Sequence, residues 1–368
     1  MPAIVLDPNN DLARLGDPWP APPASWTGTD RAKAEIYHQA AETIVWTPGL
    51  GGGNPLKLAP LPDFAAVRGD PDELGQAIAM AVSSLGHLVG TQGMRGRLRR
   101  GVLSQAMAYY ALSGAAGLDG LVRLLSDLPP GVSDIGNAAK LGRDMADGLK
   151  ATIASNPLFA APGPPLDPGL LFTSAAAGKT RVSVINLSGL PTDEGRQDFV
   201  NQLQMALFAF IKRNPPRSGQ NLTGLYVMDE AQIFAPSQTA TACKDSTIAL
   251  AAQARKYGLA MLFATQVPKN IDNRIISNCT THFYGKMSSP ASIQATQELI
   301  QSRGGAGNDI GTLWTGQFYL ATEGMAAPER IQTTLCLSHH PPAPLSNQEV
   351  LQRARSSRAA TSSGGAAA

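Results

Sequence analysis

The sequence has little cysteine and no strong excess of charge. Three cysteines, Cys243, Cys279 and Cys336, occur in 368 residues, and they form no CxxC pair. This scarcity argues against a disulfide scaffold or a structural zinc site and favours a reducing compartment. The formal net charge is +2, so we expect no broad basic surface. Any contact with nucleic acid would need a local basic cluster or an assembled ring.

Long apolar runs are also missing. No run approaches the roughly 20 residues that cross a bilayer, and the first residues show no basic segment followed by an apolar one. We therefore expect a cytoplasmic protein without membrane contact. Hydrophobic residues make up 43% of the chain, which is enough to bury the core of one large domain with a subdomain, or of two domains.

Gly178, Lys179 and Thr180 have the sequence that ends a phosphate-binding P-loop, but their surroundings do not fit. A P-loop has glycine at its first position, where this chain has Thr173. It also needs a helix after the loop, so that the phosphates meet free N–H groups. Residues 181–187 are instead rich in β-branched side chains and predict a buried strand. We predict a turn that enters a strand, with no ATP bound there.

Between residues 67 and 160 the apolar residues recur at helical spacing, and no convincing strand occurs. This pattern predicts a helical bundle inserted between strands. It contains the densest basic cluster of the chain, formed by Arg95, Arg97, Arg99 and Arg100. The cluster is a candidate contact for DNA phosphates, and a solvated helix end is the alternative interpretation.

The segment "LYVMDEAQIF" carries the strongest chemical signal. Leu225 to Met228 form an apolar strand that ends in Asp229 and Glu230. Ligands of open α/β sheets bind at this carboxyl edge. The pair suits nucleotide hydrolysis, with Asp229 holding Mg²⁺ through its water shell and Glu230 orienting and deprotonating the attacking water.

A second apolar strand, "GLAMLFATQ", ends in Thr265 and Gln266. A polar side chain at this point could sense the γ-phosphate from the strand beside the Asp-Glu strand. Arg255 precedes the strand, and arginine often neutralises a transferring phosphoryl group from a neighbouring subunit. The alternatives are a surface ion pair for Arg255 and a strand-end hydrogen bond for Gln266.

Several motifs occur in order between residue 3 and about residue 355: "IVLDPNNDLARLG", "LYVMDEAQIF", "ARKYGLAMLFATQVPKNIDNRIISNC" and "PPAPLSNQEVLQRAR". Together they resemble the HerA-type ATPases of the HerA/FtsK superfamily, which are ring-forming motors that thread DNA. The resemblance implies an α/β fold, a RecA-like (ASCE) P-loop NTPase core with a mostly parallel sheet and an inserted helical bundle. The expected domains are residues 1–66 for the start of the core, 67–160 for the insertion, 161–345 for the rest of the core, and 346–368 for a C-terminal helix and disordered tail.

The resemblance also implies roles for single residues. Asp229 matches the Walker B magnesium aspartate, Glu230 the catalytic glutamate, Arg255 the trans-acting arginine and Gln266 the sensor. Asp7 matches the acidic residue that ends the strand after the P-loop helix, near the nucleotide pocket. Thr265 and Arg274 are further candidates for nucleotide binding, Arg274 as a second candidate for an interface arginine. The implied cofactors are ATP and Mg²⁺, and the implied partners are further copies in a hexameric ring, DNA and a possible nuclease.

One departure from the family is large. The family's P-loop strand and helix would lie upstream of "PAIVLDP". We therefore expect a C-terminal portion that lacks the Walker A P-loop, binds ATP poorly by itself and is poorly soluble alone. The alternatives are a non-catalytic structural or interaction subunit of such a ring, a site completed by a separately encoded P-loop polypeptide, and a conjugation or type IV secretion ATPase with the same core.

Overall fold

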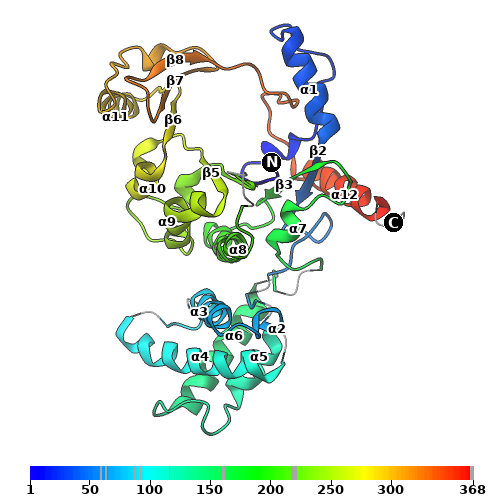
Figure 1. Cartoon of the computed structure of the whole chain (residues 1–368), viewed down its shortest axis with the longest axis vertical. Helices are drawn as coiled ribbons and strands as arrows, with labels where there is room; N and C mark the ends of the chain where they lie inside the picture. Colours follow the sequence, from blue (N-terminus) through cyan, green and yellow to red (C-terminus); the bar gives the residue numbers. More distant parts are fainter. Residues whose placement is uncertain are drawn as a thin grey trace.

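The computed structural model describes residues 1–364 except for 59, 63, 87, 92, 116, 157, 160, 161 and 217–221. Its centre is a parallel sheet of five strands in the order β2-β3-β1-β4-β5 (Figure 1). The strands are β1 (Ala3–Asp7), β2 (Ala41–Trp46), β3 (Thr180–Asn186), β4 (Gly224–Met228) and β5 (Leu259–Phe263). The sequence analysis predicted strands at the positions of β3, β4 and β5, and a mostly parallel sheet, and these predictions are confirmed.

Helices cover the two faces of this sheet unequally. α8 (Asp193–Arg213) and α9 (Lys244–Gln253) pack on one face, where Phe199 and Leu203 of α8 meet Tyr226 and Met228 of β4 in the main core. On the opposite face α12 (Asn347–Gly364) packs against β2 and β3, with Val350 buried there. The side chains of β4 and β5 on this second face are only partly buried.

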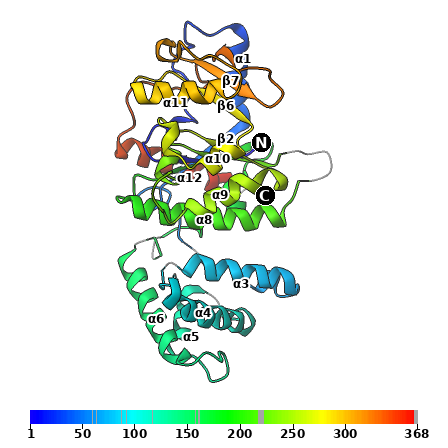
Figure 2. The same ribbon diagram turned by 90° about the vertical axis from the view of Figure 1, so that its left-hand side faces the viewer.

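A separate helical lobe lies below the sheet in Figures 1 and 2. Its helices are α2 (Phe64–Val67), α3 (Pro71–Gly86), α4 (Gly93–Ser113), α5 (Gly117–Ser126) and α6 (Ala138–Ser155). It has an apolar core of its own, in which Leu85, Leu103, Leu121 and Leu149 are fully buried. α3 rests on α8, where the buried Ser84 hydroxyl donates a hydrogen bond of 2.7 Å to Gln202 Oε1. The helices predicted between residues 67 and 160 are therefore present.

A small antiparallel sheet in the order β6-β7-β8 follows the main sheet along the chain. Its strands are β6 (Thr281–Tyr284), β7 (Gln317–Thr322) and β8 (Glu329–Gln332), with α11 (Pro290–Gln301) packed on one face. The remaining helices are α1 (Gly28–Ala40), α7 (Pro168–Phe172) and α10 (Asn273–Asn278). No described helix is both long and apolar enough to pass through a lipid bilayer.

The outer edges of the two sheets differ in how they are covered. At the β2 edge the Val45 N–H donates a 3.2 Å hydrogen bond to the Ser357 hydroxyl of α12, so a helix covers that edge. At the other end β5 pairs only with β4, and β6 pairs only with β7, among the described strands. Leu262 of β5 is 47% exposed and Phe283 of β6 is 58% exposed. Open, apolar edges of this kind favour pairing with a further strand.

The segment before β3 is rich in proline, yet the short helix α7 forms there, with Pro168 in its first turn and the Asp167 side chain capping it. Proline suits the first turn because it has no N–H to leave unpaired. At the end of the chain, α12 begins at Asn347 and continues to Gly364. Residues 365–368 lie outside the described part of the chain.

Candidate functional site

Four of the predicted residues meet at the carboxyl edge of the main sheet. Asp7 ends β1, Asp229 and Glu230 follow β4, and Gln266 follows β5 by three residues. Leu6 of β1 lies beside Met228 of β4, which lies beside Phe263 of β5. The three strands are neighbours and parallel, so their carboxyl ends bring these side chains together, as ligand sites of open α/β sheets require.

The Glu230 carboxylate is buried and held by three amides. The residue Glu230 as a whole is only 8% exposed to solvent. Oε1 accepts hydrogen bonds from Gln266 Nε2 and, at 3.5 Å, from Asn9 Nδ2, while Oε2 accepts one from Gln232 Nε2. The donors come from the segments after β1, β4 and β5. These three amides fix the orientation of the Glu230 carboxylate. No cation of the described residues forms an ion pair with it.

The backbone of Glu230 is strained. Its φ of 49° and ψ of 46° lie in the left-handed region, which residues other than glycine rarely adopt. Strain of this kind costs of order 1–3 kcal/mol and persists where the surrounding structure holds it. Here the Ala231 N–H donates to the Ala264 carbonyl oxygen at 2.8 Å, which ties the turn after β4 to the end of β5. The turn thereby aims the Glu230 side chain across the sheet edge toward Gln266.

Asp229 differs from its neighbour because it is half-buried and more open. Burial raises the pKa of its carboxyl group, and the negative charges of Glu230, Asp7 and Asp11 raise that pKa further, while the Glu230 N–H lowers it. A divalent cation would relieve this crowding of negative charge. Among the described residues no group of three or more His, Cys, Asp or Glu side chains could hold a metal by itself. Asp229 therefore fits Mg²⁺ held mainly by water and by phosphate oxygens.

Asp7 is fully buried, and the chain itself occupies its carboxylate. Oδ1 accepts from the Asp11 N–H at 3.0 Å, and Oδ2 accepts from the Ala13 N–H at 3.1 Å and from Asn186 Nδ2 at 2.9 Å. Burial raises the pKa of Asp7, and these hydrogen bonds lower it. The contacts shape the loop after β1, and that loop carries Asn9 to Glu230.

Thr265 and Arg274 are engaged with neighbours in sequence. The Thr265 hydroxyl is 3.3 Å from both the N–H and the carbonyl oxygen of Val267. Arg274 forms a two-point ion pair with Asp272, at 3.0 Å from Nε to Oδ1 and 3.0 Å from Nη2 to Oδ2. Asp272 caps α10 and also accepts from Lys244 at 3.2 Å. Their nucleotide contacts remain predictions.

The opposite edge of the sheet holds Arg255 and the Gly-Lys-Thr sequence. Arg255 lies in the short helix η3 (Ala254–Tyr257) just before β5, and Lys179 lies just before β3. β5 has five residues and β3 has seven, so Arg255 lies about 17 Å and Lys179 about 23 Å from the carboxyl edge. Gly178 has a φ of 77° in the turn, and the Lys179 N–H donates to the Ala176 carbonyl oxygen. A strand follows, not a helix, so the predicted turn that enters a strand is confirmed.

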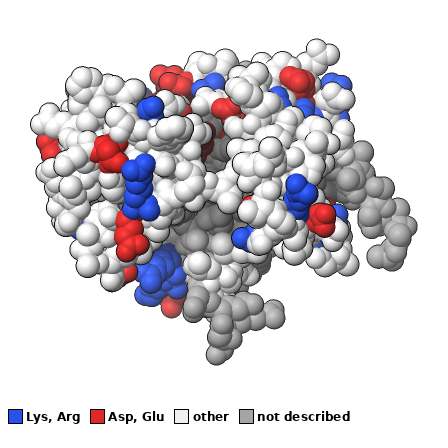
Figure 3. Space-filling model, turned by 90° about the horizontal axis from the view of Figure 1, so that it is seen from above, with Lys and Arg blue, Asp and Glu red and all other residues white. Residues whose placement is uncertain are grey.

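The predicted basic cluster lies in the helical lobe, on α4. Arg97 and Arg100 are exposed and Arg99 is half-buried. The side chain of Arg95 lies outside the described part of the chain. Figure 3 views the opposite end of the molecule, where basic and acidic side chains form small separate groups on a mostly uncharged surface.

Sequence reasoning missed Asn9 and Gln232. Both are amide residues that follow a strand closely, Asn9 after β1 and Gln232 after β4. Gln232 lies two residues after Glu230 in "DEAQ", which was a usable signal. Asn9 is 221 positions away from Glu230, and only the order of the strands shows that the two meet.

Comparison with known proteins gives one match in sequence and several in fold. No protein-family model matches the chain. A stretch of 112 residues is 30% identical to the DNA double-strand break repair helicase HerA of Sulfurisphaera tokodaii, and it covers 30% of this chain and 23% of that protein. The chain therefore spans about a quarter of the length of the relative that it matches.

The bacterial conjugative coupling protein TrwBdeltaN70 shares the fold, with a TM-score of 0.53, 10% identity and coverage of 92% of this chain and 78% of that chain. The genome packaging NTPase B204 of Sulfolobus turreted icosahedral virus 2, solved with ATP-gammaS, matches with a TM-score of 0.32 at 18% identity, over 44% of this chain and 72% of its own. The chain therefore shares the fold of this coupling protein, with its mostly parallel sheet, and one stretch of the chain is similar in sequence to HerA.

Proposed function

We propose that the chain is the core of an ATP-hydrolysing ring motor that moves DNA, of the HerA type. The observation that carries this proposal is the meeting of Asp229, Glu230 and Gln266 at one edge of the sheet, with the Glu230 carboxylate held by three amides. An acid fixed in this way at the end of a buried strand suits the activation of water beside a phosphate. The shared stretch with HerA supports the choice of DNA as the substrate.

In the proposed reaction Glu230 accepts a proton from the attacking water, and the amides of Asn9, Gln232 and Gln266 keep its oxygens pointed at that water. Asp229 would hold Mg²⁺ through the water shell of the ion. When bound, the ion neutralises charge on the β- and γ-phosphates. Gln266 contacts Glu230 from β5, so it can report the state of the phosphates to the neighbouring strand.

Arg255 lies too far from Glu230 to act within one chain. In a ring, the amino edge of one subunit's sheet can face the carboxyl edge of the next, and Arg255 is exposed at that amino edge. We therefore assign Arg255 to the site of the neighbouring subunit, where it would stabilise transition-state charge. This assignment requires a closed ring, which a hexamer would provide.

A phosphate cradle must complete the site. We propose that a strand, glycine-rich loop and helix fill the place beside β5, with the strand paired to the open edges of β5 and β6. Four side chains on the second face of the sheet support this position. Leu225 lies beside Ala260 and Val227 beside Leu262, and all four are exposed or half-exposed. A helix after the added strand would cover them, as parallel sheets require on both faces.

The test is ATP turnover by the 368-residue chain, with and without DNA, compared with Glu230→Gln. We expect little turnover by the chain alone, because the energy of binding the β- and γ-phosphates comes largely from the cradle. Fusing the strand, P-loop and helix of the S. tokodaii HerA before Ala3 should restore turnover, and Glu230→Gln should abolish it in the fusion.

Two results would contradict the proposal. Turnover by the chain alone that Glu230→Gln leaves unchanged would place the reaction elsewhere. A folded fusion that binds ATP without hydrolysing it would favour the second candidate, a non-catalytic subunit of such a ring. Movement of a protein or a single strand, with no movement of duplex DNA, would favour a conjugation or secretion motor, whose core fold this chain shares.

A further inference from the structure

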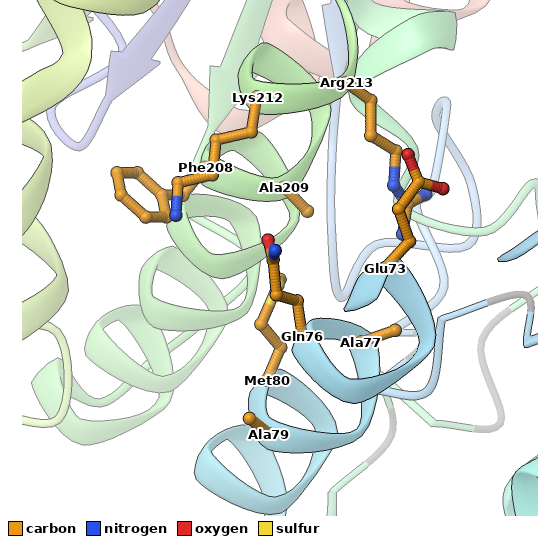
Figure 4. A pocket seen from close by; sticks show the side chains of 9 residues that line it. All are labelled: Glu73, Gln76, Ala77, Ala79, Met80, Phe208, Ala209, Lys212 and Arg213. Atoms are coloured by element: carbon orange, nitrogen blue, oxygen red, sulfur yellow. The ribbon is translucent and has the colours of Figure 1, made fainter. Parts of the chain in front are cut away.

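A pocket of about 380 Å³ lies where the helical lobe meets the main sheet, between α3 and α8. In Figure 4 Lys212 and Arg213 reach it from α8, while Gln76 and Met80 approach from α3. The walls combine alanine, methionine and phenylalanine side chains with the Gln76 amide and three charged side chains, which are Glu73, Lys212 and Arg213. This volume is within the range of sites for small planar ligands.

The rim of the pocket carries two aromatic rings with lysines over them. Phe208 and Tyr257 meet edge to face, with ring centroids 6.3 Å apart. Lys212 Nζ lies 4.5 Å from the centroid of Phe208 and 5.9 Å from that of Tyr257. Lys256 Nζ lies 5.7 Å from the centroid of Tyr257. Lys212 belongs to both pocket and rim, so the two form one continuous surface.

Two lysines of this surface lack an acidic partner. Lys212 and Lys256 are exposed, and neither forms an ion pair with a carboxylate in the described part of the chain. Glu73 also lines the pocket, and Figure 4 draws its carboxylate beside the Arg213 guanidinium. Negative groups of a ligand would therefore lie at Lys212 and Lys256.

Cations in a row beside aromatic rings are the means by which proteins bind unpaired nucleotides. The cations follow the phosphates, and the rings stack on bases. A duplex keeps its bases stacked inside, so it could not use the pocket. An acidic peptide would use the charges but has no planar group for the pocket. Single-stranded nucleic acid uses both.

We propose that this surface binds single-stranded nucleic acid, with one unstacked base in the pocket between α3 and α8 and the adjacent phosphates at Lys212 and Lys256. The Gln76 amide can donate to or accept from the edge of the base. Both α8 and η3 end at the amino edge of the sheet, opposite Glu230. The site is thus distinct from the ATP site and from the arginines of α4, and it does not depend on ATP hydrolysis.

The test measures binding of a fluorescent 20-nucleotide oligothymidylate to the 368-residue chain by anisotropy, at 50 and 200 mM salt. The variant K212Q/K256Q removes two exposed lysines. We expect at least tenfold weaker binding at 50 mM salt. Losing two phosphate contacts should also reduce the slope of log affinity against log salt by about 1.4, at about 0.7 for each contact.

The control is K33Q/K140Q, which removes the same charge from exposed lysines of α1 and α6. It should change affinity less than twofold. Phe208→Leu keeps an apolar side chain and removes the ring, and it should weaken binding by about 5- to 100-fold if a base stacks there. Circular dichroism shows whether each variant folds. If Phe208→Leu does not fold, K212Q/K256Q and K33Q/K140Q still test the proposal, because all four lysines are exposed.

Several outcomes would overturn the proposal: no binding by the unmodified chain, equal losses in the two lysine variants, or a loss confined to R97Q/R100Q. Displacement of the oligonucleotide by polyglutamate at equal concentration would point to an acidic protein instead. Glu230→Gln should bind the oligonucleotide as the unmodified chain does. Failure of ATP turnover and failure of this site are therefore separate results.

Discussion

At the sheet edge, a single residue combines a strained backbone with the side-chain geometry on which the proposed catalysis depends. Glu230 adopts a left-handed backbone that favours glycine, yet its carboxylate is the group that three amides hold. A residue that served stability alone would be glycine or asparagine at this φ. The strain at Glu230 is thus consistent with a functional requirement for a carboxylate at this position.

The strain can be measured by comparing Glu230→Gly with Glu230→Ala. Both remove the carboxylate, so their difference reports the backbone alone. We expect the glycine variant to be more stable than the alanine variant by about 1 kcal/mol in urea unfolding. At Asp229, whose φ is not positive, the same pair should show the usual order, with alanine more stable. A more stable alanine at position 230 would show that the turn relaxes in solution.

Among the elements, the turn from η4 (Pro268–Asn270) to α10 depends on one carboxylate. Asp272 is 8% exposed, caps α10 and pairs with Arg274 and Lys244. Lys244 also donates to the carbonyl oxygens of Pro236 and Thr239, at 2.6 and 3.1 Å. Asp272 therefore ties α9 and α10 to the loop that follows Glu230.

We predict that Asp272→Asn lowers the free energy of unfolding by about 2 kcal/mol at pH 7. The Arg274 side chain is the main cause that holds the pKa of Asp272 well below its usual value. Stability from a carboxylate with a lowered pKa is complete above the unfolded value of about 3.9 and is lost as the pH falls further. The difference between the two proteins should thus shrink below pH 4. A constant difference down to pH 3 would contradict this account.

The matched control is Asp147→Asn. Asp147 pairs with Lys150 on the surface of α6, with 75% of its side chain exposed. An exposed pair of this kind contributes about 0–1 kcal/mol. Urea unfolding of the two variants at pH 7 and pH 3.5 measures both effects with one method.

The sequence predicted elements better than it predicted contacts. Leu225 to Met228 and the residues of β5 are short apolar runs, and local pattern is enough to identify such strands. The pairing of Asn9 with Glu230 depends on β1 lying next to β4, which local pattern does not show. α7 was missed because the number of prolines outweighed the position of Pro168 in a capped first turn.

At the scale of the whole molecule, the uneven covering of the sheet edges is the main feature. α12 covers the β2 edge, while β5 and β6 leave apolar edges without a strand among the described residues. The same chain buries its helical lobe well, with its own apolar core. The exposed apolar side chains of the two sheets are thus concentrated at β5 and β6, where we propose that a further strand and helix bind.

The last prediction concerns self-association of the chain. Exposed strand edges pair with other copies, and lysine on an edge strand prevents this. We expect the unmodified chain to form large, mixed species in light scattering after gel filtration, and L262K/F283K to shift it toward the monomer. The control L112K changes a leucine of α4 that is 62% exposed, and it should leave the mixture unchanged.

The alternatives give different profiles in the same measurement. A discrete ring that survives L262K/F283K would mean that assembly uses other surfaces, such as the one that carries Arg255. A monodisperse monomer of the unmodified chain would mean that the β5 and β6 edges are not adhesive, and the proposed position of the phosphate cradle would lose its main support. Because lysine at these edges would also block the added strand, L262K/F283K should prevent the fusion with the HerA P-loop segment from hydrolysing ATP. If L262K/F283K both removes the mixed species of the chain and abolishes turnover by the fusion, then self-association and the added strand use the same open edges of β5 and β6.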